Sequence, residues 1–131
     1  MCVFCDIIDG KIPSKKVYED DDVLAILDIS QVTYGHTLVM PKKHYENIND
    51  CPKDLLCKVI AVTKDLNEKI MKNLDAKGSN ILTNTNEVSG QSVPHLHFHI
   101  IPRYDSKDTI MIEFIENRFD LDEVLSKIKA D

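Results

Sequence analysis

The sequence predicts an α+β fold with a five-stranded antiparallel sheet, and three observations lead to this class. Five short runs rich in β-branched and aliphatic residues are separated by polar or glycine-containing segments, as expected for strands. One longer segment, residues 51–73, repeats its apolar residues at helical spacing. A shorter helical pattern follows at the carboxyl end. Because short loops join the strands and the helices are segregated to the middle and the end, an antiparallel sheet is favoured.

Three of the predicted strands lie in the first third of the chain. Residues 17–19 and 23–27 flank the acidic cluster Glu19–Asp22, which is typical of the turn of a β-hairpin. The third run, residues 36–41, ends at Pro41, which lacks the backbone N–H that a strand ladder needs. His36 and His44 therefore bracket one strand.

The helix predicted over residues 51–73 is amphipathic. Its apolar residues at helical spacing are Leu55, Leu56, Val59, Ile60, Leu66 and Ile70. Asp50 is suited to cap its amino end, with Pro52 in the first turn. The last two strands are expected over residues 80–83 and 95–103. A second helix is expected over residues 121–128, behind Asp120.

Length, charge and hydropathy exclude several classes of function. The 131 residues fit one domain, residues 1–131, and the net charge of −6 disfavours a nucleic-acid partner, whose phosphates need a basic face. No apolar run approaches the about 20 residues that span a bilayer, and no signal-like segment follows Met1. We therefore expect a cytoplasmic protein with no membrane partner.

The four cysteines are expected to be reduced thiols or metal ligands, because disulfides are rare in proteins without a secretion signal. Cys2 and Cys5 form a C-x-x-C pair at the amino end. Cys51 and Cys57 lie at the predicted helix and have no histidine at ligand spacing.

Histidines are clustered at the fifth predicted strand. His95, His97 and His99 alternate there with three apolar residues. Side chains alternate between the two faces of a strand, so the three imidazoles are expected on one face and the apolar residues on the other. With an ordinary pKa of about 6.5, neutral imidazole dominates at pH 7 and can bind a metal or act as a nucleophile.

This histidine row resembles the H-x-H-x-H-x-x signature of the histidine triad (HIT) nucleotide-binding superfamily. The similarity extends over residues 2–104 and is greatest to the bacterial HINT-like branch. The segments that carry it are Cys2–Cys5, Ile12–Ser14, Tyr18–Asp20, Leu27–Ser30, Gly35–Val39, Pro41–His44, Gly90–Val93 and His95–Tyr104. The resemblance implies a homodimer in which two five-stranded sheets join into one of ten strands, with the main helices packed together.

The resemblance also implies a purine nucleotidyl hydrolase or transferase that works through a covalent nucleotidyl-histidine. His97 matches the nucleophile of the family. His99 matches the histidine that contacts the phosphate and supports the leaving group, and His36 matches a supporting histidine. Ser92 matches a contact to the phosphate and the leaving group.

Further nucleotide contacts are implied around this row. Asp28 matches the carboxylate that binds the ribose hydroxyls, and Ile29 lies beside the base. Asn84 matches a second contact to the phosphate and leaving group. Because the sequence has no glycine-rich phosphate loop of the known patterns, side chains must bind the phosphate together with backbone N–H groups around Gly90 and Gln91.

A structural zinc site is implied by the same resemblance. Cys2, Cys5, His44 and His95 match the four positions that carry zinc in several members of the branch. A Cys₂His₂ set closes the tetrahedral coordination of Zn²⁺ and leaves no position for a substrate. The metal is therefore expected to link the amino end to the histidine row without joining the reaction.

Three functions stay open at this point. The leading one is hydrolysis of adenosine or guanosine 5′-phosphoramidates or related nucleotidyl conjugates. Hydrolysis of dinucleoside polyphosphates is the second, and a nucleotide sensor or scaffold with little turnover is the third. The combination of His97, Ser92 and Asn84 favours catalysis over binding alone.

Overall fold

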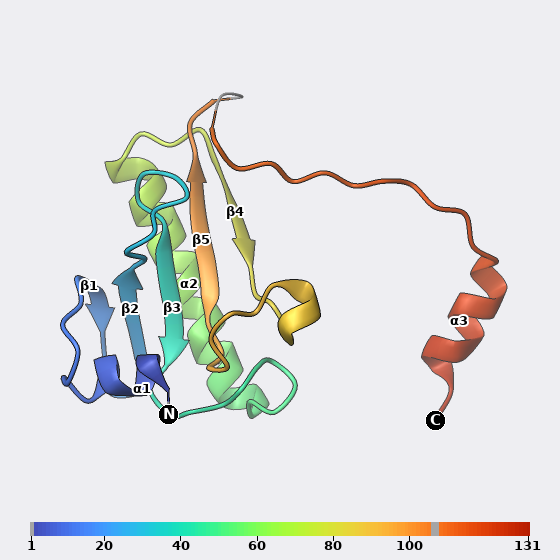
Figure 1. Cartoon of the computed structure of the whole chain (residues 1–131), viewed down its shortest axis with the longest axis horizontal. Helices are drawn as coiled ribbons and strands as arrows, with labels where there is room; N and C mark the ends of the chain where they lie inside the picture. The colour runs from blue at the N-terminus through green and yellow to red at the C-terminus, as the bar shows by residue number, and fades with distance from the viewer. Residues whose placement is uncertain (1, 106–107) are drawn as a thin grey trace.

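The computed structural model, which describes residues 2–105 and 108–131, contains a five-stranded antiparallel sheet with a helix on each face (Figure 1). The strand order is β1-β2-β3-β5-β4. The strands are β1 (Lys16–Glu19), β2 (Val23–Leu27), β3 (Thr37–Pro41), β4 (Gly78–Leu82) and β5 (Phe98–Arg103). The helices are α1 (Val3–Ile8), α2 (Lys53–Asn73), α3 (Leu121–Lys129) and the 3₁₀ helix η1 (Glu87–Ser89). The predicted fold class, the β1–β2 hairpin and both predicted helices are confirmed.

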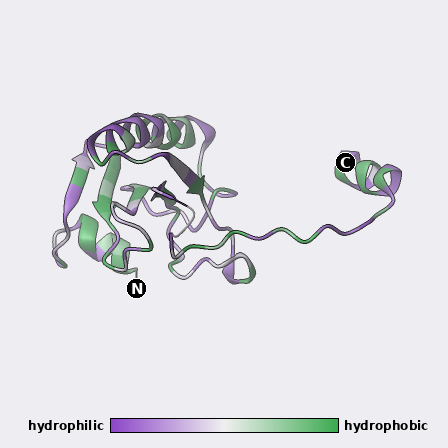
Figure 2. Ribbon diagram, turned by 90° about the horizontal axis from the view of Figure 1, so that it is seen from above, coloured by the Kyte–Doolittle hydropathy of each residue, from purple (hydrophilic) through white to green (hydrophobic). Residues whose placement is uncertain are grey.

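Both faces of the sheet are apolar, and β2 shows why. Val23 and Ala25 pack in the core between the sheet and α2. Leu24 and Ile26 point to the opposite face, where they join the buried ring of Phe4 from α1. A strand covered on both faces carries a continuous apolar run. Figure 2 shows the resulting layers, with α2 on one side of the sheet and the amino-terminal segment on the other.

Helix α1 was not expected from the sequence. Its six residues make fewer than two turns, which is too few to display a helical period. The side chain of Cys2 caps the helix by accepting a hydrogen bond from the backbone N–H of Cys5 at 3.4 Å. The histidine face of the sheet is consequently a second core and not a polar surface.

Helix α2 begins at Lys53, so the predicted amino end was two residues too early and Asp50 is not its cap. The Asp50 carboxylate instead accepts hydrogen bonds from the backbone N–H groups of Glu46 and Asn47, at 3.1 and 3.0 Å. Pro52 occupies the capping position and provides no side-chain hydrogen bond. Asp50 therefore stabilises the loop before the helix.

Strand β5 begins at Phe98, so the prediction of one strand over residues 95–103 was wrong at its amino end. The ladder with β3 ends at the pair Val39–Phe98. Two residues further along, Pro41 would face Leu96 but has no N–H to donate. The N–H of Leu96 instead donates to the carbonyl of Tyr45 at 2.7 Å. Only His99 lies within the strand, and His95 and His97 lie on the segment that enters it.

Gly35 shapes the loop between β2 and β3, which carries Asp28 and His36. Its φ is +96°, and a Cβ atom there would lie 2.4 Å from Cδ1 of Leu74. We expect Gly35→Ala to lower the free energy of unfolding by about 2–3 kcal/mol, through backbone strain and overpacking. Gly78→Ala is the matched control, since a Cβ at Gly78 meets nothing within 4 Å. Urea unfolding measures both, and equal stability of the two variants would refute this role of Gly35.

The last residues leave the body of the protein. Residues 110–120 are extended, and α3 lies apart from the sheet on the side of β4 (Figure 1). Asp120 caps α3 by accepting hydrogen bonds from the N–H groups of Asp122 and Glu123. Helix α3 contains no buried residue. Among the described residues, no helix has the length and apolar character needed to cross a membrane.

Candidate active site

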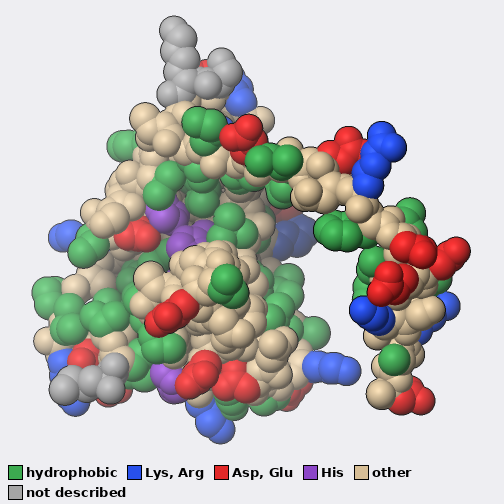
Figure 3. All heavy atoms as spheres, turned by 45° about the vertical axis from the view of Figure 1, so that its right-hand side comes forward, with side chains coloured by type: hydrophobic (Ala, Val, Ile, Leu, Met, Phe, Trp, Pro, Cys, Tyr) green, Lys and Arg blue, Asp and Glu red, His purple; other side chains and the backbone are tan. Residues whose placement is uncertain are grey.

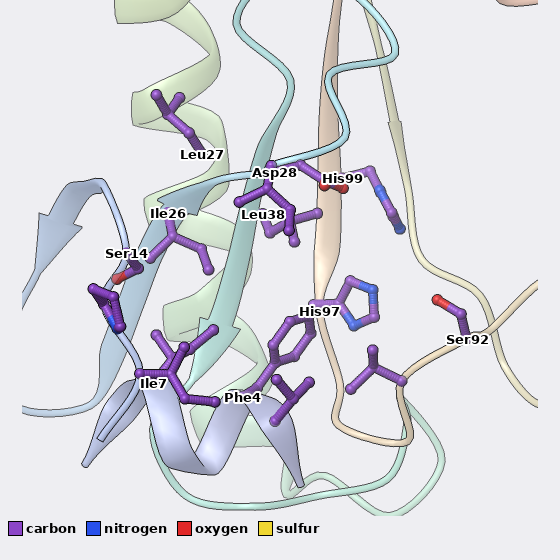
Figure 4. Close-up of a pocket in the computed structure, with 15 residues that line it drawn as sticks. Phe4, Ile7, Ser14, Ile26, Leu27, Asp28, Leu38, Ser92, His97 and His99 are labelled. Atoms are coloured by element: carbon purple, nitrogen blue, oxygen red, sulfur yellow. The ribbon is translucent and has the colours of Figure 1, made fainter. Parts of the chain in front are cut away.

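A cleft of about 320 Å³ lies between α1, the sheet and the loop before β5 (Figure 4). This volume is in the range of small-molecule binding sites. Five of the predicted site residues line it, namely Asp28, Ile29, Ser92, His97 and His99. In Figure 4 the rings of His97 and His99 and the hydroxyl of Ser92 face the same space. His36 lies behind His99, and Asn84 and Gln91 are not among the residues that line the cleft.

His97 is buried and held in one tautomer. Its Nδ1 lies 2.7 Å from the backbone carbonyl oxygen of His95, which only accepts, so Nδ1 carries the proton and donates it. The lone pair is therefore on Nε2. The edge-on ring of Phe4, with centroids 5.0 Å apart, covers the imidazole. Burial lowers the pKa of His97, which favours the neutral ring that can attack an electrophile.

His99 is oriented by a chain of hydrogen bonds through His36. The N–H of Val32 donates to Nδ1 of His36 at 3.3 Å, so the His36 proton is on Nε2. That nitrogen lies 2.9 Å from Nδ1 of His99 and donates to it. The proton of neutral His99 is consequently on Nε2, where it is available to a ligand in the cleft. The carboxylate of Asp28 lies 3.7 Å from Nδ1 of His36, at the start of this chain.

Burial, together with the neighbouring His97 and His36, lowers the pKa of His99 to about 4. His99 is therefore a neutral hydrogen-bond donor at pH 7 and not an imidazolium acid.

The lowered pKa of His99 predicts loss of stability in acid. The unfolded chain binds this proton near pH 6.5 and the folded chain only near pH 4, so the unfolded state holds more protons between these values. The free energy of unfolding should then fall by up to about 3 kcal/mol as the pH drops from 6.5 to 4. Urea titrations of the metal-free chain and of His99→Gln measure the difference. An equally steep loss in His99→Gln would show that His99 does not cause it.

Gln91 supports the loop before β5 and does not reach the cleft with its side chain. Its amide nitrogen donates to the carbonyls of Glu46 and Val93 at 2.6 and 3.1 Å, and its amide oxygen accepts from the N–H of Asn86 at 2.8 Å. The backbone N–H of Gln91 lies 3.3 Å from the carbonyl oxygen of Asn86. The structure thus places Gln91 where it fixes the position of the exposed Ser92.

The remaining predicted contacts lie at the margins of the cleft. Asn84 packs beside Gly90, where a Cβ would lie 3.6 Å from the Asn84 amide nitrogen and where φ is +106°. Ile29 is 99% exposed and forms part of the rim. Asp28 accepts a hydrogen bond from the N–H of Ser30 through one carboxylate oxygen at 2.8 Å, which keeps the side chain at the cleft.

The apolar wall of the cleft was missed from the sequence. Phe4 and Ile7 come from α1, and Ile26 and Leu38 come from β2 and β3. The continuous apolar runs of β2 and β3 give the only sequence signal for this wall, since they leave apolar side chains on the histidine face as well as on the α2 face. The unpredicted α1 supplies the rest.

Cys2, Cys5, His44 and His95 come together in one cluster, with their donor atoms all within 4.8 Å of one another. Nδ1 of His95 lies 3.4 Å from Sγ of Cys2, 3.6 Å from Sγ of Cys5 and 3.2 Å from Nδ1 of His44. Tetrahedral coordination with bonds of 2.0–2.3 Å requires ligand separations of about 3.3–3.8 Å. The donor set therefore fits a small tetrahedral cation.

The surroundings of the cluster also suit a metal. Nε2 of His95 donates to the carbonyl of Pro41 at 2.8 Å, which leaves the lone pair of Nδ1 directed into the cluster. Burial and the neighbouring Cys2 thiol raise the pKa of Cys5 to about 11. A cation bound by this thiol would therefore displace its proton.

The cleft and the metal cluster together define a class of protein. In this class a buried, neutral histidine presents a free nitrogen to the cleft, beside a hydrogen-bonded pair of imidazoles. Residues 9–106 match the family model of the HIT domain. The chain belongs to the HIT family.

Most of this chain aligns with relatives from distantly related organisms. An uncharacterised HIT-like protein of Methanocaldococcus jannaschii is 52% identical over 99% of this chain and 100% of its own length. The protein Hit of Bacillus subtilis is 50% identical over 82% of this chain and 74% of its own. Adenylylsulfatase HINT3 of Arabidopsis thaliana is 38% identical over 78% of this chain and 52% of its own.

Solved structures of the family superpose closely. A HIT family member from Bacillus subtilis has a TM-score of 0.91 at 44% identity, over 97% of this chain and 94% of its own. The histidine triad nucleotide-binding protein of Candida albicans has a TM-score of 0.86 at 31% identity, over 98% and 93%. A zinc-bound histidine triad family protein of Mycobacterium smegmatis has a TM-score of 0.79 at 35% identity, over 88% and 84%.

Proposed function

We propose that the protein is a purine nucleotidyl hydrolase that acts on nucleoside 5′-phosphoramidates or related nucleotidyl conjugates through a covalent intermediate on His97. The observation that carries the proposal is the free Nε2 of His97, which faces the cleft because Nδ1 is committed to the carbonyl of His95. The adenylylsulfatase and the nucleotide-binding protein among its relatives agree with this class of substrate.

The reaction follows from the residues as two displacements. In the first, Nε2 of His97 attacks the α-phosphorus, the bond between nitrogen and phosphorus forms, and the bond to the leaving amine breaks as that amine takes a proton from the solvent. In the second, water attacks the same phosphorus and gives one proton back to the solvent, the bond to His97 breaks so that the neutral imidazole is restored, and a nucleoside monophosphate is released. Two displacements replace one difficult step with two easier ones.

Donors around the phosphate lower both barriers. The Nε2 proton of His99 and the hydroxyl of Ser92 lie on the side of the cleft that His97 faces. They are held in place before the substrate arrives, His99 by His36 and Ser92 by the loop that Gln91 supports. Such preorganised donors stabilise the charge that develops on phosphoryl oxygens.

The apolar wall and the rim provide the nucleoside site. In this assignment the base packs against the side chains of α1, β2 and β3, with Ile29 beside it. Asp28 accepts hydrogen bonds from the ribose hydroxyls. Phe4 is buried and its ring packs edge-on against His97, so a purine would enter a surface that is already formed.

We further propose that the Cys2–Cys5–His44–His95 cluster binds one structural Zn²⁺ and that the protein is a homodimer. Zinc suits two thiolates and two imidazoles at the observed spacing. With all four ligand positions filled by protein, the ion stabilises the link between α1 and the histidine row and takes no part in the displacements.

Parallel turnover assays test the proposed reaction. Adenosine 5′-phosphoramidate and diadenosine polyphosphates are incubated separately with the purified protein, and release of AMP is followed. We expect the phosphoramidate to have at least a tenfold higher kcat/KM. Faster cleavage of the polyphosphates would assign the protein to dinucleoside polyphosphate hydrolysis, and tight AMP binding without turnover of either substrate would favour a sensor or scaffold.

A further inference from the structure

The loop between β2 and β3, residues 28–36, carries one part of the site at each of its ends. Asp28 follows β2 and His36 precedes β3, and the N–H of Asp28 donates to the carbonyl of His36 at 3.0 Å. A carboxylate oxygen of Asp28 and one ring nitrogen each of His36 and His99 lie within 4.8 Å of one another. Figure 3 shows histidine side chains set back in the surface of the body, with an acidic side chain beside them. The geometry of the site therefore depends on how the two ends of this loop are held.

The side chain of Gln31 bridges the two ends of the loop. Its amide nitrogen donates to the carbonyl of Asp28 at 2.5 Å and to the carbonyl of His36 at 2.8 Å. Its amide oxygen accepts from the N–H of Gly35 at 2.8 Å. A glutamine amide has two N–H donors and one carbonyl acceptor, so both donors and the acceptor are used within the loop. No carboxylate could replace this amide, because a carboxylate cannot donate to the two carbonyls.

Gln31 also fixes the residue that sets the tautomer of His36. Val32 follows directly in the chain, and its N–H donates to Nδ1 of His36 at 3.3 Å. This hydrogen bond keeps the His36 proton on Nε2, which donates to Nδ1 of His99. If the N–H of Val32 moved away, the proton of His36 would be drawn to Nδ1, toward the Asp28 carboxylate at 3.7 Å. His36 would then no longer donate to His99, and the proton of His99 would no longer be held on Nε2.

We propose that Gln31 is a positioning residue of the active site and acts through Asp28 and His36. Gln31 is not among the described residues that line the cleft, so its effect on a bound substrate passes through these two. Loss of its amide would displace the Asp28 carboxylate and release the tautomer of His36. A displacement of about 1 Å away from the reacting atoms can cost about a hundredfold in rate. The expected effect on turnover rests on the proposed function, whereas the expected effect on the imidazoles does not.

Nitrogen NMR of the imidazoles tests the positioning without a substrate. The protein is labelled with ¹⁵N at histidine and studied at about pH 8, where buried imidazoles are neutral. In the wild type we expect His36 and His99 each to carry the proton on Nε2 alone. In Gln31→Met, which keeps the length of the side chain but has no amide, both rings should show a mixture of the two tautomers. Unmixed wild-type tautomers in this variant would overturn the proposal.

Kinetics of two variants separate positioning from a loss of stability. Gln31→Glu, which keeps the acceptor for Gly35 but has no donor, is the second variant and guards against misfolding of Gln31→Met. For adenosine 5′-phosphoramidate, each should lower kcat at least about tenfold and raise KM at least about threefold, because the donor and the ribose contact are both displaced. A chain that is only less stable loses active molecules, which lowers kcat at unchanged KM. Unchanged KM in both variants would therefore contradict the proposal.

Tyr104→Phe is the matched control for loosening of the loop. The hydroxyl of Tyr104 donates to the carbonyl of Tyr34 at 2.5 Å, in the same loop but away from Asp28 and His36. Its loss should leave both tautomers unmixed and change kcat and KM less than threefold. Effects as large as those of the Gln31 variants would mean that any loosening of the loop suffices, and would overturn the assignment to Gln31. A wild-type chain without turnover would contradict the proposed function, and the imidazole spectra would still decide the role of Gln31.

Discussion

Replacement of His97 by alanine is expected to lower kcat for adenosine 5′-phosphoramidate by at least about a thousandfold, because it removes the nucleophile of both displacements. Affinity for AMP should change less than tenfold, since the apolar wall, Asp28 and His99 remain. The imidazole contributes few ground-state contacts, so the loss falls on kcat and not on KM. Steady-state kinetics and calorimetric AMP titration measure the two effects.

A second variant separates loss of the nucleophile from loss of the fold. His97 is buried against Phe4, and a cavity at this position could destabilise α1. His97→Gln retains most of the volume and can still donate to the carbonyl of His95, but it has no nucleophilic ring nitrogen. This variant should lose as much activity as His97→Ala, and its melting temperature should stay within a few degrees of that of the wild type. Activity within tenfold of wild type in either variant would remove His97 from its proposed role.

The second large effect is expected from disrupting the metal cluster. Cys2→Ser combined with Cys5→Ser, or chelation, should lower the melting temperature by about 10 °C or more. A Zn²⁺ ion bound there would link α1 to the loop after β3 and to the segment before β5, and closed zinc sites contribute several kcal/mol to folding. Because Phe4 and Ile7 on α1 form part of the cleft wall, KM should rise. With two thiolates, such a zinc site would be net neutral, so kcat should change less than tenfold.

Cys57→Ser is the matched control for the cluster variants. Cys57 is an exposed thiol on α2 and lies outside the cluster, so its replacement should alter neither the melting temperature nor the kinetics. Elemental analysis should find close to one zinc per chain in the wild type. A metal-free wild-type protein, or chelation that abolishes kcat while the fold is intact, would contradict a structural zinc.

The regular part of the fold was predictable because periodicity reports which faces are buried. The short apolar runs of β2 and β3 and the helical spacing of α2 led to the correct strands and main helix. The short α1 was not predictable, since fewer than two turns give no period and its amino end is set by the Cys2 side chain. The start of β5 depends on Pro41 in a neighbouring strand, and a tertiary contact of this kind has no local signal.

In the candidate site, too, some features could be predicted from the sequence and others could not. The spacing of His95, His97 and His99 predicted that the three imidazoles share one face, and the resemblance indicated Cys2 and His44 as partners of His95 in a metal cluster. Neither could show that the Nδ1 proton of His97 is fixed by a backbone carbonyl or that His36 orients His99, because these contacts depend on ring positions in three dimensions. Nor could the sequence show that the side chain of Gln91 supports the loop before β5, because its hydrogen-bond partners Glu46 and Asn86 are placed there by the fold.

The stereochemical course of hydrolysis at phosphorus tests the central claim most directly. An adenosine substrate whose α-phosphorus is chiral through sulfur substitution is hydrolysed in H₂¹⁸O, and the configuration of the product is determined. Each in-line displacement inverts the phosphorus, so attack by His97 followed by attack of water predicts net retention. Net inversion would mean a single attack by water and would contradict the covalent intermediate on His97.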